Sequence, residues 1–546
     1  MSSSILEVRN LTTQFGHGEH AVKVVDDVSF TINKGETFVL LGESGSGKSI
    51  TAMSIMRLLP PAANVSHGEV ILNDKSLFQL PEKNMRDIRG GGIGMIFQEP
   101  QSSLNPVLTA GQQIQETLLR HKGLNKKQSI ARSIELLDAV GIPEPDRRVN
   151  EYPHQFSGGM KQRIMIAIAL AGEPELLVAD EPTTALDVTI QAQVLELLND
   201  LQQKTGMGIL FITHDLGVAA QMADHIAVMK QGVIVEAKTK DDLFAKPEHP
   251  YTHQLFDAIP SWEKRVAEQG EVEVDNSDKQ PLLNVSDLKV YYPIRKGILK
   301  RVVDHVRAVD GVSIDVNEGE TVAVVGESGS GKTTMGKGIL QLLQTTDGKI
   351  LFNGEDLSTL DNDAMREKRS DIQIVFQDPY SSMNPRMMVR DILQEGMLAQ
   401  GIGQSRVERD KLTAELLQQV GLLPEHQYRY PHEFSGGQRQ RICIARALAL
   451  KPKLIICDEP TSALDVSVQA QILALLKDLQ QEYKISYLFI THNISVVEYI
   501  AHYVAVMYKG CVVEQGAVND VLQNPQNEYT KKLLSAVPRV ALSAGS

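Results

Sequence analysis

The stretch GESGSGKS at residues 42–49 decides the fold of this chain, and it recurs as GESGSGKT at residues 326–333. Each copy follows a short apolar run, at residues 37–41 or 321–325, and the first runs into a helical pattern at residues 50–59. A Gly-x-x-x-x-Gly-Lys-Ser/Thr loop between a strand and a helix lets backbone N–H groups converge on a phosphate, and the helix N-terminus adds a favourable dipole. The sequence therefore predicts two phosphate-binding loops.

The loop chemistry also assigns individual nucleotide contacts. Lys48 and Lys332 would reach the β- and γ-phosphates, while Ser49 and Thr333 would offer a hydroxyl to Mg²⁺. The loop residues predicted to bind nucleotide are Gly42, Ser44, Gly45, Gly47, Lys48, Ser49 and Ile50 in the first copy and Gly326, Ser328, Gly329, Gly331, Lys332, Thr333 and Thr334 in the second.

Further motifs follow each loop in the same order. Three pairs of matching residues are each 278 positions apart, namely Ser157 and Ser435, Asp180 and Asp458, and His214 and His492. A repeat of this kind sets the architecture of the whole chain. Because a domain typically has about 150 residues, a chain of 546 residues is also long enough for at least two domains.

Two acidic residues end a short apolar run in each half. Asp180 and Asp458 are predicted to hold Mg²⁺, directly or through water, and Glu181 and Glu459 to polarise the attacking water. Hydrolysis of a phosphoanhydride depends chiefly on positioning and charge neutralisation, so these few groups suffice.

A glutamine and a histidine complete each predicted site. Gln98 and Gln377 end strand-like runs, where an amide can contact Mg²⁺ or water and nucleotide. His214 and His492 follow identical Phe-Ile-Thr runs, at the tip of a further predicted strand. We predict that both histidines contact the γ-phosphate and belong to the catalytic groups.

Aromatic residues stand at matching places ahead of the two loops. Phe15 and Tyr292 are predicted to stack on adenine, because an aromatic ring offers a flat apolar face to a base. A role in the core would explain either residue as well, and the sequence leaves both readings open.

Composition argues against several classes of protein without excluding all of them. The net charge is −13, whereas nucleic-acid binders usually present basic surfaces. No apolar run reaches the roughly 18 residues needed to span a bilayer, and residues 1–10 lack the pattern of a secretory signal, so a cytosolic or peripheral protein is expected. Cys443, Cys457 and Cys511 have no metal-type spacing, and the first two are expected in the core.

Alternating strand and helix patterns predict the fold. Short apolar runs such as residues 175–179 and 453–457 resemble buried parallel strands, so each half is expected to be a three-layer α/β domain. Residues 263–280 are acidic and nearly free of large apolar side chains, which favours a linker. The predicted limits are a first domain at 1–262, an acidic linker at 263–281 and a second domain at 282–546.

Together these motifs resemble the ATP-binding cassette (ABC) ATPases over nearly the whole chain. The segments that resemble the family signature are Ser157-Gly158-Gly159-Met160 and Ser435-Gly436-Gly437-Gln438, and those that resemble its D-loop are Ala185-Leu186-Asp187 and Ala463-Leu464-Asp465. The resemblance implies two P-loop NTPase (RecA-like) domains in tandem, each with an antiparallel β subdomain and a helical subdomain. Met160 departs from the usual glutamine and could make the two sites unequal.

The resemblance also implies how the two halves cooperate. In the family each ATP is shared head to tail, so Lys48 would share one nucleotide with Ser435, and Lys332 would share the other with Ser157. The signature residues thereby implied to bind nucleotide are Ser157, Gly158 and Gly159 in the first half and Ser435, Gly436, Gly437 and Gln438 in the second. ATP binding would close the cassettes and hydrolysis would reopen them. The helical subdomain, hinged at Gln98 and Gln377, would accept a short helix from a membrane permease.

A narrower resemblance points to the di- and oligopeptide importers. It rests on residues 98–106 and 377–385, and on the tails at 249–252 (HPYT) and 528–530 (EYT), each followed by an apolar helix. Members often carry a cysteine cluster in the tail; neither tail here has a cysteine, so no iron–sulfur cluster is predicted. The expected cofactors are ATP and Mg²⁺.

The fused arrangement narrows the resemblance further. Together with the basic insert at 293–305, it is most similar to the fused ATPases of microcin C-type peptide importers and somewhat less similar to those of glutathione importers. The insert is interpreted as a solvated hairpin, with contact to an acidic partner or anionic lipid as the alternative. The implied partners are two permease subunits and an extracytoplasmic peptide-binding protein, and the implied location is the cytoplasmic face of the inner membrane.

Two other classes share the motif order. Soluble twin-cassette translation factors carry a long basic linker, unlike the short acidic residues 263–280. DNA-repair and chromosome-structure ATPases insert zinc modules or long coiled coils between loop and signature, and the segment from Ser49 to Ser157 is too short for these. Both remain remote alternatives.

Overall fold

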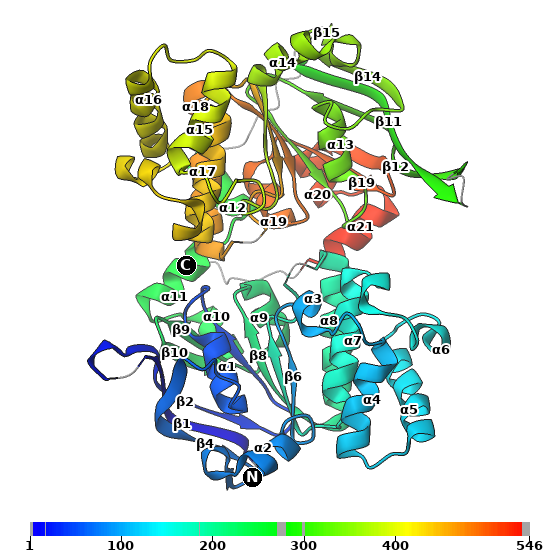
Figure 1. Cartoon of the computed structure of the whole chain (residues 1–546), viewed down its shortest axis with the longest axis vertical. Helices are drawn as coiled ribbons and strands as arrows, with labels where there is room; N and C mark the ends of the chain where they lie inside the picture. Colours follow the sequence, from blue (N-terminus) through cyan, green and yellow to red (C-terminus); the bar gives the residue numbers. More distant parts are fainter. Residues whose placement is uncertain are drawn as a thin grey trace. The chain divides into compact units, whose positions relative to one another are not determined.

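The computed structural model describes residues 4–16, 18–184, 186–269, 280–296, 301–462 and 464–537. The chain divides into two compact units, the first in the main from residues before 258 and the second from residues 258–537. Figure 1 shows the elements of each unit. Ala185 and Ala463, named above in the D-loops, lie outside the described residues.

The first unit is built on a six-stranded sheet in the order β10-β9-β3-β8-β7-β6. Neighbours within β9-β3-β8-β7-β6 are parallel, and β10 is antiparallel to β9. The strands are β3 (Thr37–Leu41), β6 (Ile93–Ile96), β7 (Leu176–Asp180), β8 (Gly208–Thr213), β9 (His225–Lys230) and β10 (Val233–Thr239). β3, β6, β7 and β8 are buried throughout, which is why they read as continuous apolar runs.

An antiparallel sheet and a set of helices complete the first unit. The sheet has the order β2-β1-β4-β5, from β1 (Ser4–Phe15), β2 (Val22–Asn33), β4 (Ala63–Leu72) and β5 (Lys75–Ser76). The helices are α1 (Lys48–Met56), α2 (Glu82–Ile88), α3 (Pro100–Ser103), α4 (Ala110–His121), α5 (Lys126–Ala139), α6 (Pro145–Arg148), α7 (Gly158–Leu170), α8 (Val188–Thr205), α9 (Leu216–Met222), α10 (Lys240–Ala245) and α11 (Pro250–Asp257). Short 3-10 turns are η1 (Gly18–His20), η2 (Leu77–Gln79) and η3 (Pro153–Gln155).

The second unit repeats this plan. Its main sheet has the order β16-β17-β18-β13-β19-β20 and its antiparallel sheet β12-β11-β14-β15. The strands are β11 (Leu283–Lys296), β12 (Arg301–Val316), β13 (Thr321–Val325), β14 (Asp347–Phe352), β15 (Glu355–Asp356), β16 (Ile372–Val375), β17 (Leu454–Asp458), β18 (Ser486–Ile490), β19 (Tyr503–Tyr508) and β20 (Cys511–Ala517). The helices are α12 (Trp262–Gln269), α13 (Lys332–Ile339), α14 (Asn362–Asp371), α15 (Val389–Ala399), α16 (Arg406–Gln419), α17 (Gly436–Leu448), α18 (Val466–Tyr483), α19 (Ile494–Ile500), α20 (Val518–Gln523) and α21 (Glu528–Ser535), with 3-10 turns η4 (Leu357–Thr359), η5 (Pro424–Tyr428) and η6 (Pro431–Glu433).

A helical subdomain stands apart from the antiparallel sheet in each unit. α4, α5 and α7 pack together in the first, and α15, α16 and α17 in the second (Figure 1). Capping boxes begin α4 at Thr109 and α5 at Asn125, where a side chain and a backbone N–H satisfy each other reciprocally. These caps fix where the subdomain helices start. The expected architecture of a main sheet, an antiparallel β subdomain and a helical subdomain is confirmed.

Several predicted elements differ in detail. The helix behind the first phosphate loop ends at Met56 rather than Leu59, because Arg57 adopts a left-handed conformation with φ of 52°. The predicted runs at 94–98 and 373–377 end two residues early, so Gln98 and Gln377 lie in the loops after β6 and β16. Cys443 and Cys457 are buried, as expected.

The basic insert is part of a hairpin. β11 and β12 pair antiparallel out to Lys296 and Arg301, and residues 297–300 lie outside the described part of the chain. Val302, Val303 and Val306 on this hairpin are exposed. The expected hairpin is therefore confirmed for the described residues.

The predicted linker differs from expectation over its first residues. Residues 262–269 form α12, which packs on α19. The Arg265 side chain is 1% exposed, and its guanidinium donates to the carbonyl oxygens of Glu498 and Ala501 at the end of α19. The acidic composition hid this contact because few side chains supply it, chiefly the buried Arg265 and the partly buried Trp262, which packs on the apolar core of the second unit. Residues 270–279 lie outside the described residues, and the domain limits remain predictions.

Within the described residues, none of the helices combines the length and the apolar character that a membrane crossing requires.

Candidate nucleotide site

The first phosphate loop joins β3 to α1, and Lys48, Ser49 and Ile50 are the first residues of that helix. Gly47 has φ of +103°, and a Cβ there would lie 2.5 Å from the carbonyl oxygen of Val24, so only glycine fits. The buried Lys48 Nζ donates to the carbonyl oxygens of Gly42 at 2.7 Å and Glu43 at 2.8 Å. The residues between β3 and α1, at 42–47, therefore form a loop around Lys48, and the predicted residues 48–50 begin the helix.

The second loop joins β13 to α13 in the same way, with Lys332, Thr333 and Thr334 opening the helix. Lys332 Nζ donates to Gly326 O at 2.7 Å and Glu327 O at 2.9 Å. Burial lowers the pKa of this ammonium group, against the attraction of nearby carboxylates. A buried cation held by backbone oxygens is suited to receive a phosphate.

A hydroxyl and a carboxylate meet at the end of the neighbouring strand. Ser49 Oγ donates to Asp180 Oδ1 at 2.9 Å, and Thr333 Oγ1 donates to Asp458 Oδ1, also at 2.9 Å. Burial raises the pKa of Asp180 to about 6, against the hydrogen bond from Ser49, and burial raises the pKa of Asp458 as well. A buried carboxylate with a raised pKa is one that a nearby cation would stabilise.

The next residue along the chain carries the second carboxylate. In the first unit Gln98 Nε2 donates to Glu181 Oε2 at 2.8 Å, and His214 Nδ1 lies 3.3 Å from Glu181 Oε1. In the second, Gln377 Nε2 donates to Glu459 Oε2 at 3.0 Å. Each unit thus brings together the glutamate and glutamine that the sequence predicted.

The histidine completes the second group too, with His492 Nδ1 at 3.2 Å from Glu459 Oε2. Glu181 and Glu459 both have φ of +46°, in the left-handed region that a residue with a side chain adopts at a cost. A strained conformation that recurs at the same place in both units indicates that the position of this carboxylate matters.

The glutamates remain ionised. Burial would raise the pKa of Glu181, but the hydrogen bond from His214 and the charges of His214 and Lys48 outweigh it and hold the pKa at about 2. The pKa of Glu459 is lowered by the same kinds of contact. At neutral pH each glutamate is therefore a carboxylate able to accept a hydrogen bond from water, beside a second, more basic carboxylate.

The signature residues begin a helix in each unit. Gly158 and Gly159 open α7 behind Ser157, and Gly436 and Gly437 open α17 behind Ser435. Both serines are exposed N-caps. In α17 the Gln438 side chain also accepts from the Ser435 N–H at 3.1 Å, which closes a capping box that Met160 cannot form in α7.

The two aromatic residues lie on the antiparallel sheets. Phe15 ends β1 and is half-buried, and Tyr292 lies within β11 with 41% of its surface exposed. Their stacking on adenine stays a prediction.

Sequence reasoning missed two kinds of contact at these sites. Thr184 Oγ1 donates to Glu181 Oε2 at 3.0 Å, a partner that only its place three residues after the glutamate could have suggested. Two tail tyrosines also contact the phosphate loops, Tyr251 in the first unit and Tyr529 in the second. The tail motifs had been noted, but their contact with the loops had no local signal.

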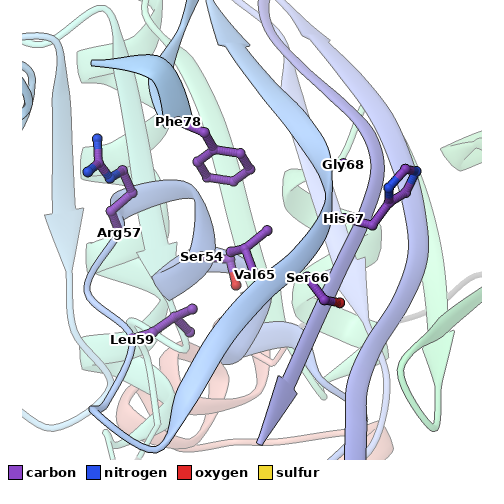
Figure 2. Close-up of a pocket in the computed structure, with 8 residues that line it drawn as sticks. All are labelled: Ser54, Arg57, Leu59, Val65, Ser66, His67, Gly68 and Phe78. Carbon is purple, nitrogen blue, oxygen red and sulfur yellow. The ribbon is translucent and has the colours of Figure 1, made fainter. Parts of the chain in front are cut away.

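A cavity of about 390 Å³ in the first unit lies elsewhere (Figure 2). It is lined by the C-terminal end of α1, by β4 and by η2, at Ser54, Arg57, Leu59, Val65, Ser66, His67, Gly68 and Phe78. None of these is a predicted nucleotide residue. The phosphate loop lies at the other end of α1, whose nine residues span about 13 Å.

The models of two protein families match this chain. The model of the ABC transporter family matches residues 25–184 and 309–462, and the model of the oligopeptide/dipeptide transporter C-terminal region matches 235–280 and 513–545. Each therefore matches once in each half.

Full-length relatives cover nearly the whole chain. The peptidoglycan transport ATP-binding protein YejF of Agrobacterium fabrum is 49% identical over 97% of this chain and 96% of its own length. The glutathione import ATP-binding protein GsiA is 48% identical in Salmonella typhi and 47% in Escherichia coli, each over 98% of this chain and 90% of its own length.

Proposed function

Because this chain belongs to the ABC transporter family, as its two cassette matches and its full-length relatives show, we propose that it powers the import of peptides with ATP hydrolysed at two sites. It is an ATPase of the transport-coupled kind. Peptides are proposed because both tails match the oligopeptide/dipeptide transporter C-terminal region and because relatives are named for peptidoglycan and glutathione transport.

The observation that carries the proposal is the repeated group of glutamate, glutamine and histidine. In both units a carboxylate in a left-handed conformation lies within 3.3 Å of the histidine and accepts from the glutamine. Neither unit lacks a member, which supports two hydrolytic sites rather than one active and one degenerate site.

The side chains have distinct roles in the proposed reaction. Lys48 and Lys332 would exchange their backbone carbonyl partners for phosphate oxygens of ATP. Glu181 and Glu459, ionised at neutral pH, would orient and polarise the attacking water, and His214 and His492 would contact the γ-phosphate. Because so low a pKa makes a weak base, positioning of the water is the larger part of the glutamate's contribution.

The donor sets suit Mg²⁺. Ser49 with Asp180, and Thr333 with Asp458, offer a hydroxyl and a carboxylate oxygen, the hard ligands that this ion prefers, with Gln98 and Gln377 as further oxygen donors. Bound there, Mg²⁺ would neutralise charge on the phosphates. No iron–sulfur cluster is proposed.

The transport partners follow from the family. We propose two permease subunits that dock on the helical subdomains, an extracytoplasmic peptide-binding protein, and a peripheral position at the cytoplasmic face of the inner membrane. The head-to-tail sharing of each ATP between a phosphate loop and the opposite signature serine, Ser157 or Ser435, is part of the same proposal.

Affinity purification of this chain from detergent-solubilised native membranes tests the proposal. We expect two multi-span permeases to co-purify, and ATP-dependent uptake of a labelled peptide by vesicles that hold the reconstituted complex. Recovery with ribosomes or DNA and no permease would overturn the transport assignment while leaving the ATP chemistry standing.

Glutathione is the second candidate cargo, favoured by relatives whose identity to this chain is nearly as high as that of the peptidoglycan transporter. Competition in the same uptake assay separates the two. If glutathione at equal concentration lowers the uptake of the labelled peptide, glutathione is favoured as the cargo. If the uptake is unchanged by glutathione, other peptides are favoured.

A further inference from the structure

The tails of both units reach the phosphate loops through a tyrosine. In the first unit the N–H of Glu43 donates to the hydroxyl of Tyr251 on α11, at 3.4 Å. In the second unit the N–H of Glu327 donates to the hydroxyl of Tyr529 on α21, at 3.1 Å. The two tyrosines are 278 positions apart, as are the catalytic pairs, so the contact belongs to the repeat and not to one unit.

The peptide that each tyrosine contacts is the one that holds the lysine. The N–H of Glu43 and the carbonyl of Gly42 belong to one planar peptide group, and the carbonyl accepts from Lys48 Nζ at 2.7 Å. In a trans peptide the N–H and the C=O point in opposite directions, so the tyrosine hydroxyl and the lysine hold the same plane from its two edges. Fixing one edge fixes the direction of the other.

Each tyrosine is itself held in place. A strand carboxylate binds the start of each tail helix, since Glu236 on β10 accepts from the N–H of His249 at 3.0 Å and from the hydroxyl of Thr252 at 2.6 Å. Glu514 on β20 likewise accepts from the N–H of Gln526 at 2.7 Å and of Asn527 at 3.2 Å. The tail therefore reaches the loop from a rigid strand.

A second side chain packs on each tyrosine ring. Lys230 Nζ lies 4.4 Å from the centre of the Tyr251 ring, and the rings of Tyr508 and Tyr529 have centres 4.2 Å apart. Lys230 and Tyr508 end equivalent strands, β9 and β19. Each hydroxyl is thus fixed by its helix and by the end of a neighbouring strand.

We infer that Tyr251 and Tyr529 are positioning residues for ATP, which orient the Gly-Glu peptide of the phosphate loop and through it the phosphate-binding lysine. The inference rests on the proposed role of Lys48 and Lys332. It makes the tail a part of each ATP site, so that the HPYT and EYT motifs serve nucleotide binding as well as the shape of the tail.

Removal of the hydroxyl alone tests the inference. In the full-length chain, Lys48→Ala leaves only the second site, and Tyr529→Phe in that background reports on it; Lys332→Ala with Tyr251→Phe reports on the first. Because one neutral hydrogen bond is removed, we expect the Kd for ATP to rise about 3- to 10-fold at the second site and less at the first, where the bond is longer. The kcat at saturating ATP and the Tm should change little.

Controls separate this inference from the proposed function. Tyr483→Phe removes a hydroxyl that accepts from Gln419 at the far end of α18, and should leave ATP affinity unchanged. Loss of ATP binding in the double variant Lys48→Ala/Lys332→Ala shows that the lysine sites are real; binding that survives there overturns the proposed function instead.

Two outcomes would overturn the inference while the lysine sites stand. One is a Kd for ATP that is the same with and without the tyrosine substitution in both Lys→Ala backgrounds. The other is a fall in Tm and kcat together with an unchanged Kd, which would make the hydroxyls structural.

Discussion

The lysines proposed to bind phosphate make matching hydrogen bonds in the two units, with lengths of 2.7, 2.8 and 3.4 Å about Lys48 and 2.7, 2.9 and 3.5 Å about Lys332. Outside the phosphate chemistry the units diverge. Gln438 closes a capping box that Met160 cannot close, and a lysine packs on one tail tyrosine where a tyrosine packs on the other.

The comparison indicates which positions the proposed reaction constrains. Groups that would touch phosphate, water or Mg²⁺ recur with the same geometry, because small displacements there are costly to catalysis. Groups that touch only protein are replaced by others that fill the same place, such as Lys230 by Tyr508. The features that the two sites share can therefore be tested by substituting their residues. The features that differ can be tested by exchanging residues between the units.

The largest expected effect comes from the glutamates. Glu181→Gln with Glu459→Gln should lower ATP turnover about 10²- to 10⁴-fold, since each carboxylate that polarises water is replaced by an amide. ATP binding should persist because the phosphate loops are untouched, and the cassettes should stay closed on ATP. Phosphate release under saturating ATP measures the turnover.

Single variants sharpen the comparison between units. If both sites hydrolyse ATP, Glu181→Gln and Glu459→Gln should each lower the turnover, by about half if the sites are equal and independent and by more if each site needs the other. Glu196→Gln, at an exposed position on α8, is the matched control. Undiminished phosphate release by the double variant would contradict the assigned roles, and full turnover in one single variant would show that its unit does not hydrolyse ATP.

The next effect concerns stability and pH. Asp180 has a pKa of about 6 against an ordinary value of 3.8, so the folded protein holds a proton there more tightly than the unfolded chain. Stability from this group is therefore present below pH 3.8 and is lost as the pH rises through 6. Asp180→Asn removes the burial penalty of the charge but keeps an oxygen that can accept from Ser49.

In ligand-free protein without Mg²⁺, Asp180→Asn should raise the free energy of unfolding at pH 8 by about 1–3 kcal/mol, while ATP turnover is lost. The gain should shrink as the pH falls from 6 toward 4. Urea unfolding at pH 8 and pH 4.5 measures it, with Asp458→Asn as the matched variant in the other unit. A gain that is equal at both pH values would contradict a raised pKa.

Much of each site could be predicted from sequence because its residues lie at strand ends and loop positions with fixed offsets. Lys48, Asp180 and Glu181 are brought together by β3 and β7, two strands whose apolar pattern is plain. The tail tyrosine could not be placed, since it contacts the loop across 208 positions through a single hydroxyl.

The same reason explains why helix α12 could not be predicted from the sequence. Arg265 fills a site made of backbone carbonyls more than 230 positions away, and no local pattern shows that such a site exists. Long-range contacts through one polar atom leave no pattern in the local sequence, whereas strands buried on both faces leave continuous apolar runs.

The smallest expected effect lies at the signature helices. In α17 the Ser435 hydroxyl accepts from the Gln438 N–H, and the Gln438 side chain accepts from the Ser435 N–H, whereas in α7 only the first of these bonds forms. Met160→Gln would supply the second bond. It should stabilise the first unit by about 0.5–1 kcal/mol, and Gln438→Met should destabilise the second by a similar amount.

Thermal unfolding of both variants and of the double exchange measures the effect. Since the two positions lie in separate helices, the changes should nearly cancel in the double exchange. Turnover should respond differently from stability, because a better-ordered N-terminus at α7 would hold the amides of Gly158 and Gly159 ready for phosphate. If Met160→Gln stabilised the chain and left turnover unchanged at every ATP concentration, the capping difference would concern the helix alone, and the two ATP sites would be equivalent despite it.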